Sequence, residues 1–362
     1  MEKEMRMKKQ DKFIFSLNGL YESYGFSKYV MSKFEEYSLY QENRNFLKSE
    51  DVITFSGKDG KLMALRPDVT LSIVKSRNLS GGETEKLYYV ENVYRKSLES
   101  GDFKELSQVG VESIGDVGEI ENTETVILAL KTLDSIDENF VLDLSHVMFI
   151  EGLIDTFNLK TLEDKQKVYA LLNSKNMHDI EKLKESLKLS CENVDDFKAL
   201  VSLQGAVEKV LSSARALVRN EKMAKAIEEI ENIYSLVKLC GLADKIKLDF
   251  SIQSTAEYYN GIIFQGFVEK SNKAVLSGGR YDKLLNKFNK SCRAIGFALY
   301  LGEIEDYFVE DKTEYDIIVL YNDKTDKAQL IKEVENLRKE GKSVSLQRNI
   351  KGKYKKIEDK RC

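Results

Sequence analysis

Apolar residues between positions 12 and 36 recur mostly at helical spacing, which predicts one or two opening helices. In residues 52–65 the pattern changes to two short apolar runs around a polar, glycine-containing stretch, which is typical of a β-hairpin. A helix is predicted from 68 to about 78, because Pro67 and Asp68 suit a first helical turn.

The next part of the chain combines strands and helices. Residues 86–95 and 105–114 are β-rich and are joined by a polar loop, so they are expected to be antiparallel neighbours. A helix at 119–133 and a strand at 140–144 complete a mixed block. Residues from 149 to about 244 are instead rich in Leu, Lys, Glu and Ala at three-to-four spacing, which predicts a helical insertion.

Strand patterns return after the insertion, and a short α/β fragment follows them. Strands are predicted at 246–252, 262–269 and 274–276, a glycine turn at 277–279, a helix at 281–288 and a last apolar unit at 293–307. The fragment is predicted to contain a strand at 315–321, a helix at 324–339 and a strand at 343–346.

Composition narrows the possible classes of protein. The chain has 362 residues, enough for a sizeable core, and its 56 basic and 60 acidic residues give no overall field that would gather a polyanion. The basic run at 351–361 is interpreted as a solvated tail without an assigned function. The apolar run at 13–17 is too short for a signal peptide or a membrane span, so a cytoplasmic protein is expected.

The residues that most often bind metals or act as nucleophiles are few and scattered. The four cysteines are far apart, and His146 and His178 are the only histidines, so we predict no zinc site, no disulfide framework and no Ser/His/Asp triad. There is neither a P-loop nor a G-x-G-x-x-G turn, and no cofactor is predicted.

Three separate segments carry candidate chemistry. In Leu-Arg-Pro-Asp-Val-Thr, at 65–70, Asp68 could hold the ammonium of an amino acid, although it could equally be an ordinary helix start. On the predicted strand pair, Gln108 and Glu112 point to one face and Arg95 ends the partner strand; a solvated sheet face would have the same pattern. The third segment joins Glu-Tyr-Tyr-Asn-Gly at 257–261 with Ser-Gly-Gly-Arg-Tyr-Asp at 277–282 and Arg-Ala-Ile-Gly-Phe-Ala at 293–298; packing alone could explain its tyrosines.

Taken in order, these segments resemble the class II histidyl-tRNA synthetase family from about residue 11 to 307. The resemblance implies an α+β fold: a class II aminoacyl-tRNA synthetase-like domain at 1–310, with an antiparallel sheet flanked by helices and a helical insertion at about 150–244, followed by a short C-terminal α/β fragment at 311–362. It also implies a histidine pocket made of Asp68, Thr70, Arg95, Lys104, Gln108, Glu112, Tyr258 and Tyr259.

Several arginines that this family uses to bind ATP are replaced. The motif 2 loop has Asp102 and Lys104 where the family has arginines, and Ser97 or Leu98 where it has a glutamate. Ser254 replaces the arginine of the second histidine motif, and Glu303 is near the place of the motif 3 arginine. Loss of one such transition-state stabiliser costs about 2–4 kcal/mol, so no catalytic residues are predicted.

The retained amino-acid residues and lost arginines resemble the synthetase-like regulatory subunits of ATP phosphoribosyltransferase. That resemblance implies a non-catalytic subunit that binds L-histidine as an effector, is a dimer within a hetero-octamer, and is needed by a short catalytic subunit and for histidine feedback in the first step of histidine biosynthesis. The alternatives are a divergent histidyl-tRNA synthetase and a paralogue that binds tRNA or modifies a protein. The fragment after Tyr315 is shorter than an anticodon-binding domain, so tRNA is not expected as a substrate.

Overall fold

A computed structural model describes residues 8–43, 52–77, 83–96, 101–175, 179–252, 258–309 and 315–361. The chain divides into two compact units: residues 14–307 form the larger, and residues 1–13 with 308–362 form the smaller. None of the helices in these ranges is both long and apolar enough to cross a membrane.

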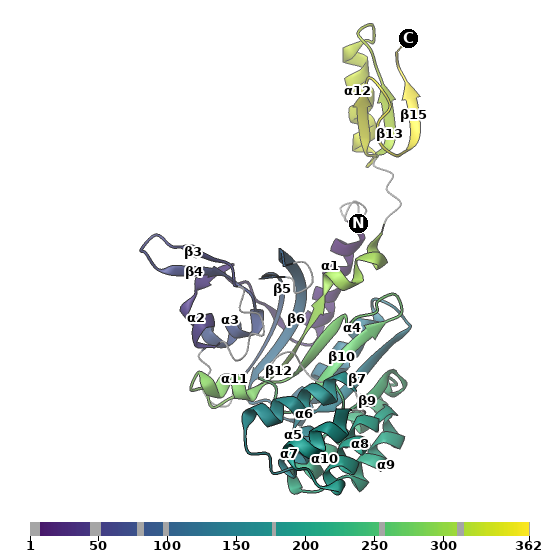
Figure 1. Ribbon diagram of the computed structural model, residues 1–362. Coiled ribbons are helices and arrows are strands. Elements are labelled where there is room, and N and C mark those ends of the chain that lie inside the picture. The colour runs from purple at the N-terminus through teal and green to yellow at the C-terminus, as the bar shows by residue number, and fades with distance from the viewer. Residues whose placement is uncertain are drawn as a thin grey trace. The chain divides into compact units, whose positions relative to one another are not determined.

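The larger unit is built on a sheet that has nine strands among the described residues (Figure 1). In its central part, which runs in space through β5, β6, β12, β11, β10 and β7, each strand pairs antiparallel with the next. The pairs β1–β5 and β7–β9 at the two ends of this part are parallel. In spatial order the strands are β1 (Ser27–Lys28), β5 (Thr84–Lys96), β6 (Phe103–Gly115), β12 (Arg293–Tyr300), β11 (Leu276–Arg280), β10 (Ile262–Val268), β7 (Phe140–His146), β9 (Ile246–Asp249) and β8 (Gln204–Ala206).

Helices cover one face of this sheet. Tyr21 of α1 packs against Tyr88 and Phe297, and Leu133 of α4 packs over Gly266. The opposite face carries the candidate site. The helical elements outside the insertion are α1 (Lys9–Ser23), α2 (Ser38–Glu42), α3 (Val69–Ser76), α4 (Glu119–Asp134) and α11 (Asp282–Lys287), with 3-10 segments η4 (Ala243–Lys245) and η5 (Leu301–Phe308).

The helices predicted between residue 149 and about 244 are present, and they gather at the β7–β9 end of the sheet (Figure 1). It comprises α5 (Val147–Asp155), α6 (Leu162–Ser174), α7 (Ile180–Leu187), α8 (Cys191–Ser202), α9 (Val207–Ala216) and α10 (Glu221–Leu239). It also contains the short strand β8, which the sequence did not predict and which joins the main sheet beside β9.

A second, three-stranded antiparallel sheet contains the predicted hairpin. Its order is β2 (Phe34–Glu36), β4 (Leu62–Leu65) and β3 (Thr54–Ser56). The prediction of helix up to residue 36 is therefore wrong: α1 ends at Ser23, and the residues after Gly25 form β1 and β2. The positive φ of Gly25, 81°, marks the point where the helical pattern stops.

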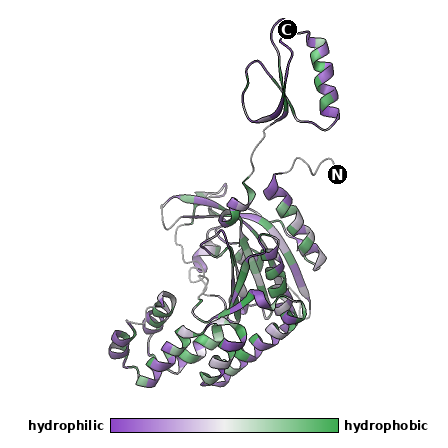
Figure 2. Cartoon of the chain, turned by 90° about the vertical axis from the view of Figure 1, so that its right-hand side faces the viewer, coloured by the Kyte–Doolittle hydropathy of each residue, from purple (hydrophilic) through white to green (hydrophobic). Residues whose placement is uncertain are grey.

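The smaller unit contains a parallel sheet in the order β14 (Val344–Gln347), β13 (Tyr315–Leu320), β15 (Tyr354–Asp359). The helix α12 (Lys327–Lys339) connects β13 to β14 in the sequence. Hydrophobic and hydrophilic residues alternate around α12 (Figure 2), and Leu330 and Val334 pack on Ile317 and Val319. Residues 351–361 are mostly exposed, as predicted, but they do not form a tail, because β15 lies in that run and pairs with β13.

The predicted glycine turn at 277–279 is also wrong, because these residues lie inside β11. A Cβ at Gly278 would lie 2.4 Å from the carbonyl oxygen of Gly296 and 2.5 Å from Cβ of Phe297. A Cβ at Gly279 would lie 2.6 Å from the carbonyl oxygen of Ile262. The glycines are therefore explained by close contact between neighbouring strands rather than by a turn.

Candidate functional site

The face of the main sheet that lies opposite α1 and α4 carries a set of polar and aromatic side chains, and α3 and α11 pack over part of it. Gln108 lies directly opposite Tyr300 of β12, and Glu112 lies opposite Gly296. On β5, which pairs with the other edge of β6, Tyr89 lies opposite Gly110. Directly opposed residues of an antiparallel pair share a face, so these side chains form one floor, as the sequence predicted for Gln108 and Glu112.

Glu112 is the buried centre of this floor. Its side chain accepts hydrogen bonds from the Thr70 hydroxyl at 2.7 Å and from the Tyr281 hydroxyl at 2.6 Å, one to each carboxyl oxygen. Gly296 leaves the space for it, since a Cβ there would lie 1.8 Å from Glu112 Oε2. Burial raises the pKa of Glu112 to about 8, and the nearby charge of Asp68 acts in the same direction, against the two hydrogen bonds.

Asp68 connects this centre to the start of α3. It is the N-cap residue, and its Oδ1 accepts a hydrogen bond from the backbone N–H of Leu71 at 2.8 Å. Its Oδ2 lies 3.3 Å from Nη2 of Arg95, whose Nε donates to the carbonyl oxygen of Pro67 at 2.5 Å. Pro67 therefore precedes the cap instead of occupying the first turn, and Arg95 is turned towards Asp68.

Tyrosine rings form a wall beside Glu112. The ring centroids of Tyr258 and Tyr259 are 4.9 Å apart, and those of Tyr258 and Tyr281 are 5.9 Å apart. Burial is the main cause that raises the pKa values of Tyr258 and Tyr259 well above the ordinary value, and the next contribution comes from Asp68 for Tyr258 and from Tyr300 for Tyr259. These phenols stay neutral, so the wall offers aromatic faces and hydroxyl groups beside a single buried carboxyl.

We call the six residues Asp68, Thr70, Glu112, Tyr258, Tyr259 and Tyr281 the Glu112 cluster. The sequence missed Tyr281, although it stands inside the Gly-Gly-Arg-Tyr-Asp motif, and it also missed Tyr89 and Tyr300 on the floor. Tyr300 additionally forms a short hydrogen bond with Ser277.

Other predicted residues lie outside the cluster or outside the described residues. Lys104 lies opposite Arg95 in the β5–β6 ladder and is exposed, as is Asp102 nearby. Glu303 is exposed in η5, so its effect on a bound phosphate stays a prediction. The substitutions at Ser97 or Leu98 and at Ser254 lie outside the described residues.

The histidine that the structure describes has a structural role. His146 is buried, its Nδ1 accepts from the backbone N–H of Met148 at 3.2 Å, and its Nε2 lies 3.0 Å from Glu229 of α10. His178 lies outside the described residues.

Comparisons with known proteins agree on one family. Residues 3–304 match the family model described as histidyl-tRNA synthetase. An ATP phosphoribosyltransferase regulatory subunit from Thermoanaerobacter sp. (strain X514) is 30% identical over 92% of this chain and 93% of its own length. The protein of the same name from Caldanaerobacter subterraneus subsp. tengcongensis is 32% identical over 84% of this chain and 78% of its own. The protein of the same name from Clostridium botulinum (strain Langeland) is 30% identical over 80% of this chain and 69% of its own length.

Solved structures show the same fold. The crystal structure of an ATP phosphoribosyltransferase regulatory subunit/histidyl-tRNA synthetase from Bacillus halodurans has a TM-score of 0.79 and 23% identity, covering 96% of this chain and 93% of that one. The histidyl-tRNA synthetase of Nostoc sp. PCC 7120 has a TM-score of 0.73 and 16% identity, covering 94% and 82%. The fold is thus that of a class II synthetase, and the chain belongs to the family of histidyl-tRNA synthetase-like ATP phosphoribosyltransferase regulatory subunits.

Proposed function

We propose that this chain is a non-catalytic regulatory subunit of ATP phosphoribosyltransferase that binds L-histidine in the Glu112 cluster. It would be required by a short catalytic subunit and would transmit feedback inhibition by histidine in the first step of histidine biosynthesis. The names of the relatives support the regulatory role. The observation that carries the ligand is a buried carboxyl among tyrosines, beside a second carboxylate at a helix start.

The cluster fits the two ends of histidine. Glu112, buried beside aromatic rings, suits the imidazole ring, which can stack on tyrosine and exchange a hydrogen bond with a carboxyl group. Asp68 suits the α-ammonium, and the partly exposed guanidinium of Arg95 beside it suits the α-carboxylate. Binding would replace part of the Asp68–Arg95 contact with contacts to the ligand.

Adenylation of histidine has weaker support. A developing pentavalent phosphate needs fixed cations, and bidentate guanidinium groups serve it better than lysine. Where the resemblance predicts two such arginines, the end of the β5–β6 hairpin presents Asp102 and Lys104.

We expect the purified chain to bind histidine but not to activate it. Calorimetric titration should give a dissociation constant near ~1 µM for histidine, about −8 kcal/mol, and no saturable heat with ATP, either alone or with histidine. Histidine-dependent exchange of pyrophosphate into ATP would contradict the proposal and would favour a divergent synthetase. Absence of histidine binding would exclude the ligand assignment.

The regulatory role also requires assembly, which we propose to be a dimer within a hetero-octamer with the short catalytic subunit. The sheet β2–β4–β3 supports an interface, because the side chains of Phe34 and Phe55, which share one of its faces, are 54% and 39% exposed. The two phenylalanine rings lie 5.5 Å apart. Exposed apolar groups that lie together are typical of surfaces that become buried on association.

Phe34→Glu is expected to lower the mass of the isolated chain, measured by light scattering, from that of a dimer to that of a monomer. A charge buried at an interface without a partner costs several kcal/mol. Lys58→Glu, which also introduces an acidic residue but lies in the turn between β3 and β4, should keep the dimer. Equal masses for the two variants would exclude this surface. Failure of the wild-type chain to stimulate a short catalytic subunit would exclude the regulatory role.

A further inference from the structure

Asp282 joins three parts of the chain that are far apart in sequence. Its Oδ1 accepts a hydrogen bond from the backbone N–H of Ala294, at the start of β12, at 2.9 Å. Its Oδ2 accepts from Nε of Arg280 at 2.8 Å and from Nδ2 of Asn260 at 3.3 Å. The Asp282 side chain is 15% exposed, so these contacts are largely protected from solvent.

The contact with Asn260 matters because this residue directly follows the two tyrosines of the cluster. The backbone N–H of Asn260 donates to the carbonyl oxygen of Arg280 at 2.9 Å, so the segment is attached to β11 through both backbone and side chain. The stem of Arg280 covers Gly261, where a Cβ would lie 2.9 Å from its Cδ. Tyr259 in turn packs on Gly279, where a Cβ would lie 2.9 Å from its Cδ1. The tyrosine pair is therefore held from its C-terminal side.

Asp282 also follows Tyr281, whose hydroxyl donates to Glu112. The backbone N–H of Tyr281 donates to the carbonyl oxygen of Ala294 at 2.8 Å, while the Asp282 carboxylate accepts from the N–H of the same residue. This pair of bonds fixes the backbone from which Tyr281 extends. The Asp282 carboxylate therefore supports the backbone of all three tyrosines of the Glu112 cluster, although it is not a member of that cluster.

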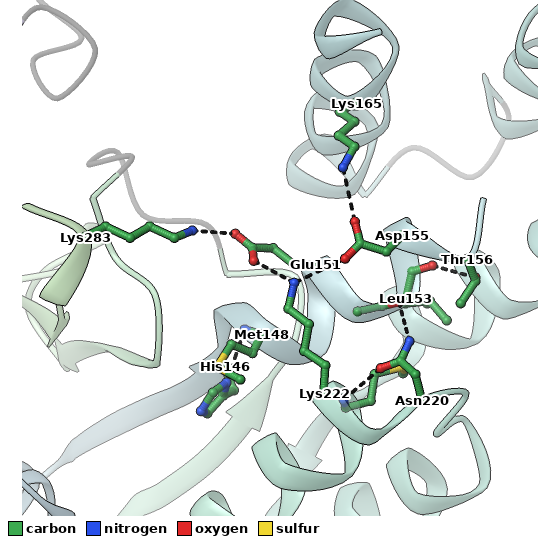
Figure 3. A network of polar contacts seen from close by, with 12 residues as sticks. His146, Met148, Glu151, Leu153, Asp155, Thr156, Lys165, Asn220, Lys222 and Lys283 are labelled. Carbon is green, nitrogen blue, oxygen red and sulfur yellow. Dashed lines mark hydrogen bonds and ion pairs between the residues drawn. The ribbon is translucent and has the colours of Figure 1, made fainter. Parts of the chain in front are cut away.

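Arg280, the ion-pair partner of Asp282, also acts on a carboxylate of the insertion. Burial alone would raise the pKa of Glu229, but the hydrogen bond from His146 and the nearby charge of Arg280 lower it. The Arg280 guanidinium thus acts on carboxylates of both α10 and α11. A second connection runs from Lys283 to Glu151 of α5, 2.9 Å apart, and Glu151 also binds Lys222 (Figure 3). Lys283 offers a matched control, since its ammonium binds the insertion and not the tyrosine segment.

We infer that Asp282 is a positioning residue for the proposed histidine site: it holds Tyr258, Tyr259 and Tyr281 in place through Asn260, Arg280 and Ala294. The inference rests on the proposed function for its ligand, but not for its geometry. In Asp282→Asn the new amide can present only one oxygen, so its N–H₂ must face either the donors of Arg280 and Asn260 or the N–H of Ala294. Either the attachment of the tyrosine segment or the bond to Ala294 that fixes the backbone of Tyr281 is then lost.

The test uses the full chain carrying 3-fluorotyrosine, with the ¹⁹F resonances of Tyr258 and Tyr259 assigned through Tyr258→Phe and Tyr259→Phe. Without ligand, Asp282→Asn should shift or broaden both resonances and leave that of Tyr307, which donates to Asp137, unchanged. Histidine affinity measured by calorimetry should fall about 10-fold to 100-fold, the usual effect of a displaced supporting group. Asp282→Glu should partly restore the wild-type resonances and part of the histidine affinity. Lys283→Met should change neither.

Resonances and affinity in Asp282→Asn that match those of Lys283→Met would overturn the inference. If Asp282→Asn fails to fold, Asn260→Ala removes the same bond from the tyrosine side and must shift the two resonances. If the wild-type chain binds no histidine, the proposed function fails, yet the ligand-free spectra still decide whether Asp282 positions the tyrosines.

Discussion

Arg66→Met is expected to lower the free energy of unfolding by about 3–5 kcal/mol, the usual effect of removing one partner from a buried ion pair. The Arg66 side chain is fully buried. Its Nη2 donates to Glu91 at 2.7 Å and to the carbonyl oxygen of Asn92 at 3.0 Å, and its Nη1 donates to the carbonyl oxygen of Ser32 at 2.7 Å. Methionine keeps the apolar stem but leaves a carboxylate and two carbonyl groups without their donor.

Urea unfolding at pH 7 measures this loss as a lower midpoint with an unchanged slope. Lys61→Met is the matched control, because Lys61 forms an exposed ion pair with Glu36 at 2.6 Å and such pairs contribute about 0–1 kcal/mol. Equal losses in the two variants would show that burial of the Arg66 pair has no energetic consequence. Adding Glu91→Gln to Arg66→Met should recover part of the stability, since no unpaired carboxylate is then left.

Replacement of Arg66 is also expected to affect the site, because Arg66 immediately precedes Pro67 and Asp68. Its backbone N–H donates to the carbonyl oxygen of Lys33, and its own carbonyl accepts from the N–H of Tyr94, both at 3.0 Å. The segment that ends in Asp68 is therefore fixed between the small sheet and β5. Sequence reasoning treated Arg66 only as part of a motif, because its partners are 25 to 34 residues away.

Local patterns predicted what depends on local spacing. The segments around Tyr89 and Val109 are β-rich and joined by a polar loop, so their antiparallel pairing was predictable, and strand geometry then put Gln108 and Glu112 on one face. The three-to-four spacing of the insertion likewise predicted helices. Such patterns depend on which side of an element is buried, and that information is present in a short window of sequence.

The incorrect or missed predictions concern features that depend on contacts between residues far apart in the sequence. Gly278 and Gly279 suggested a turn, but their reason is contact with β12 and β10, which no local window contains. Tyr281 was missed as a site residue because its hydroxyl bonds to Glu112, 169 positions earlier. The basic run at 351–361 forms a strand because it pairs in parallel with β13, and several of its charges, such as that of Lys355 on Asp316, are neutralised by residues elsewhere.

Replacement of Glu112 tests the site itself. Glu112→Gln is expected to weaken histidine binding about 2-fold to 10-fold, because a hydrogen bond to a neutral group contributes about 0.5–1.5 kcal/mol. The amide has nearly the same shape, so the space beside Gly296 stays filled and Thr70 and Tyr281 keep one acceptor between them. Calorimetric titration gives the affinity. Glu105→Gln, the same exchange at an exposed position of β6, should leave histidine binding unchanged.

The same variant should change how stability depends on pH. In the folded, ligand-free chain the Glu112 pKa is raised to about 8 from an ordinary value of 4.5, so between these values the folded state holds a proton that the unfolded chain releases. The stabilisation from this proton is complete below about pH 4.5 and is lost as the pH rises through about 8. Glutamine carries no such proton, so the stability of the wild type relative to Glu112→Gln, measured by urea unfolding, should decrease from pH 5 to about pH 8 and level off above that pH. A constant difference over that range would mean that Glu112 is ionised throughout in the folded protein, and the imidazole would then meet a carboxylate instead of a neutral acid.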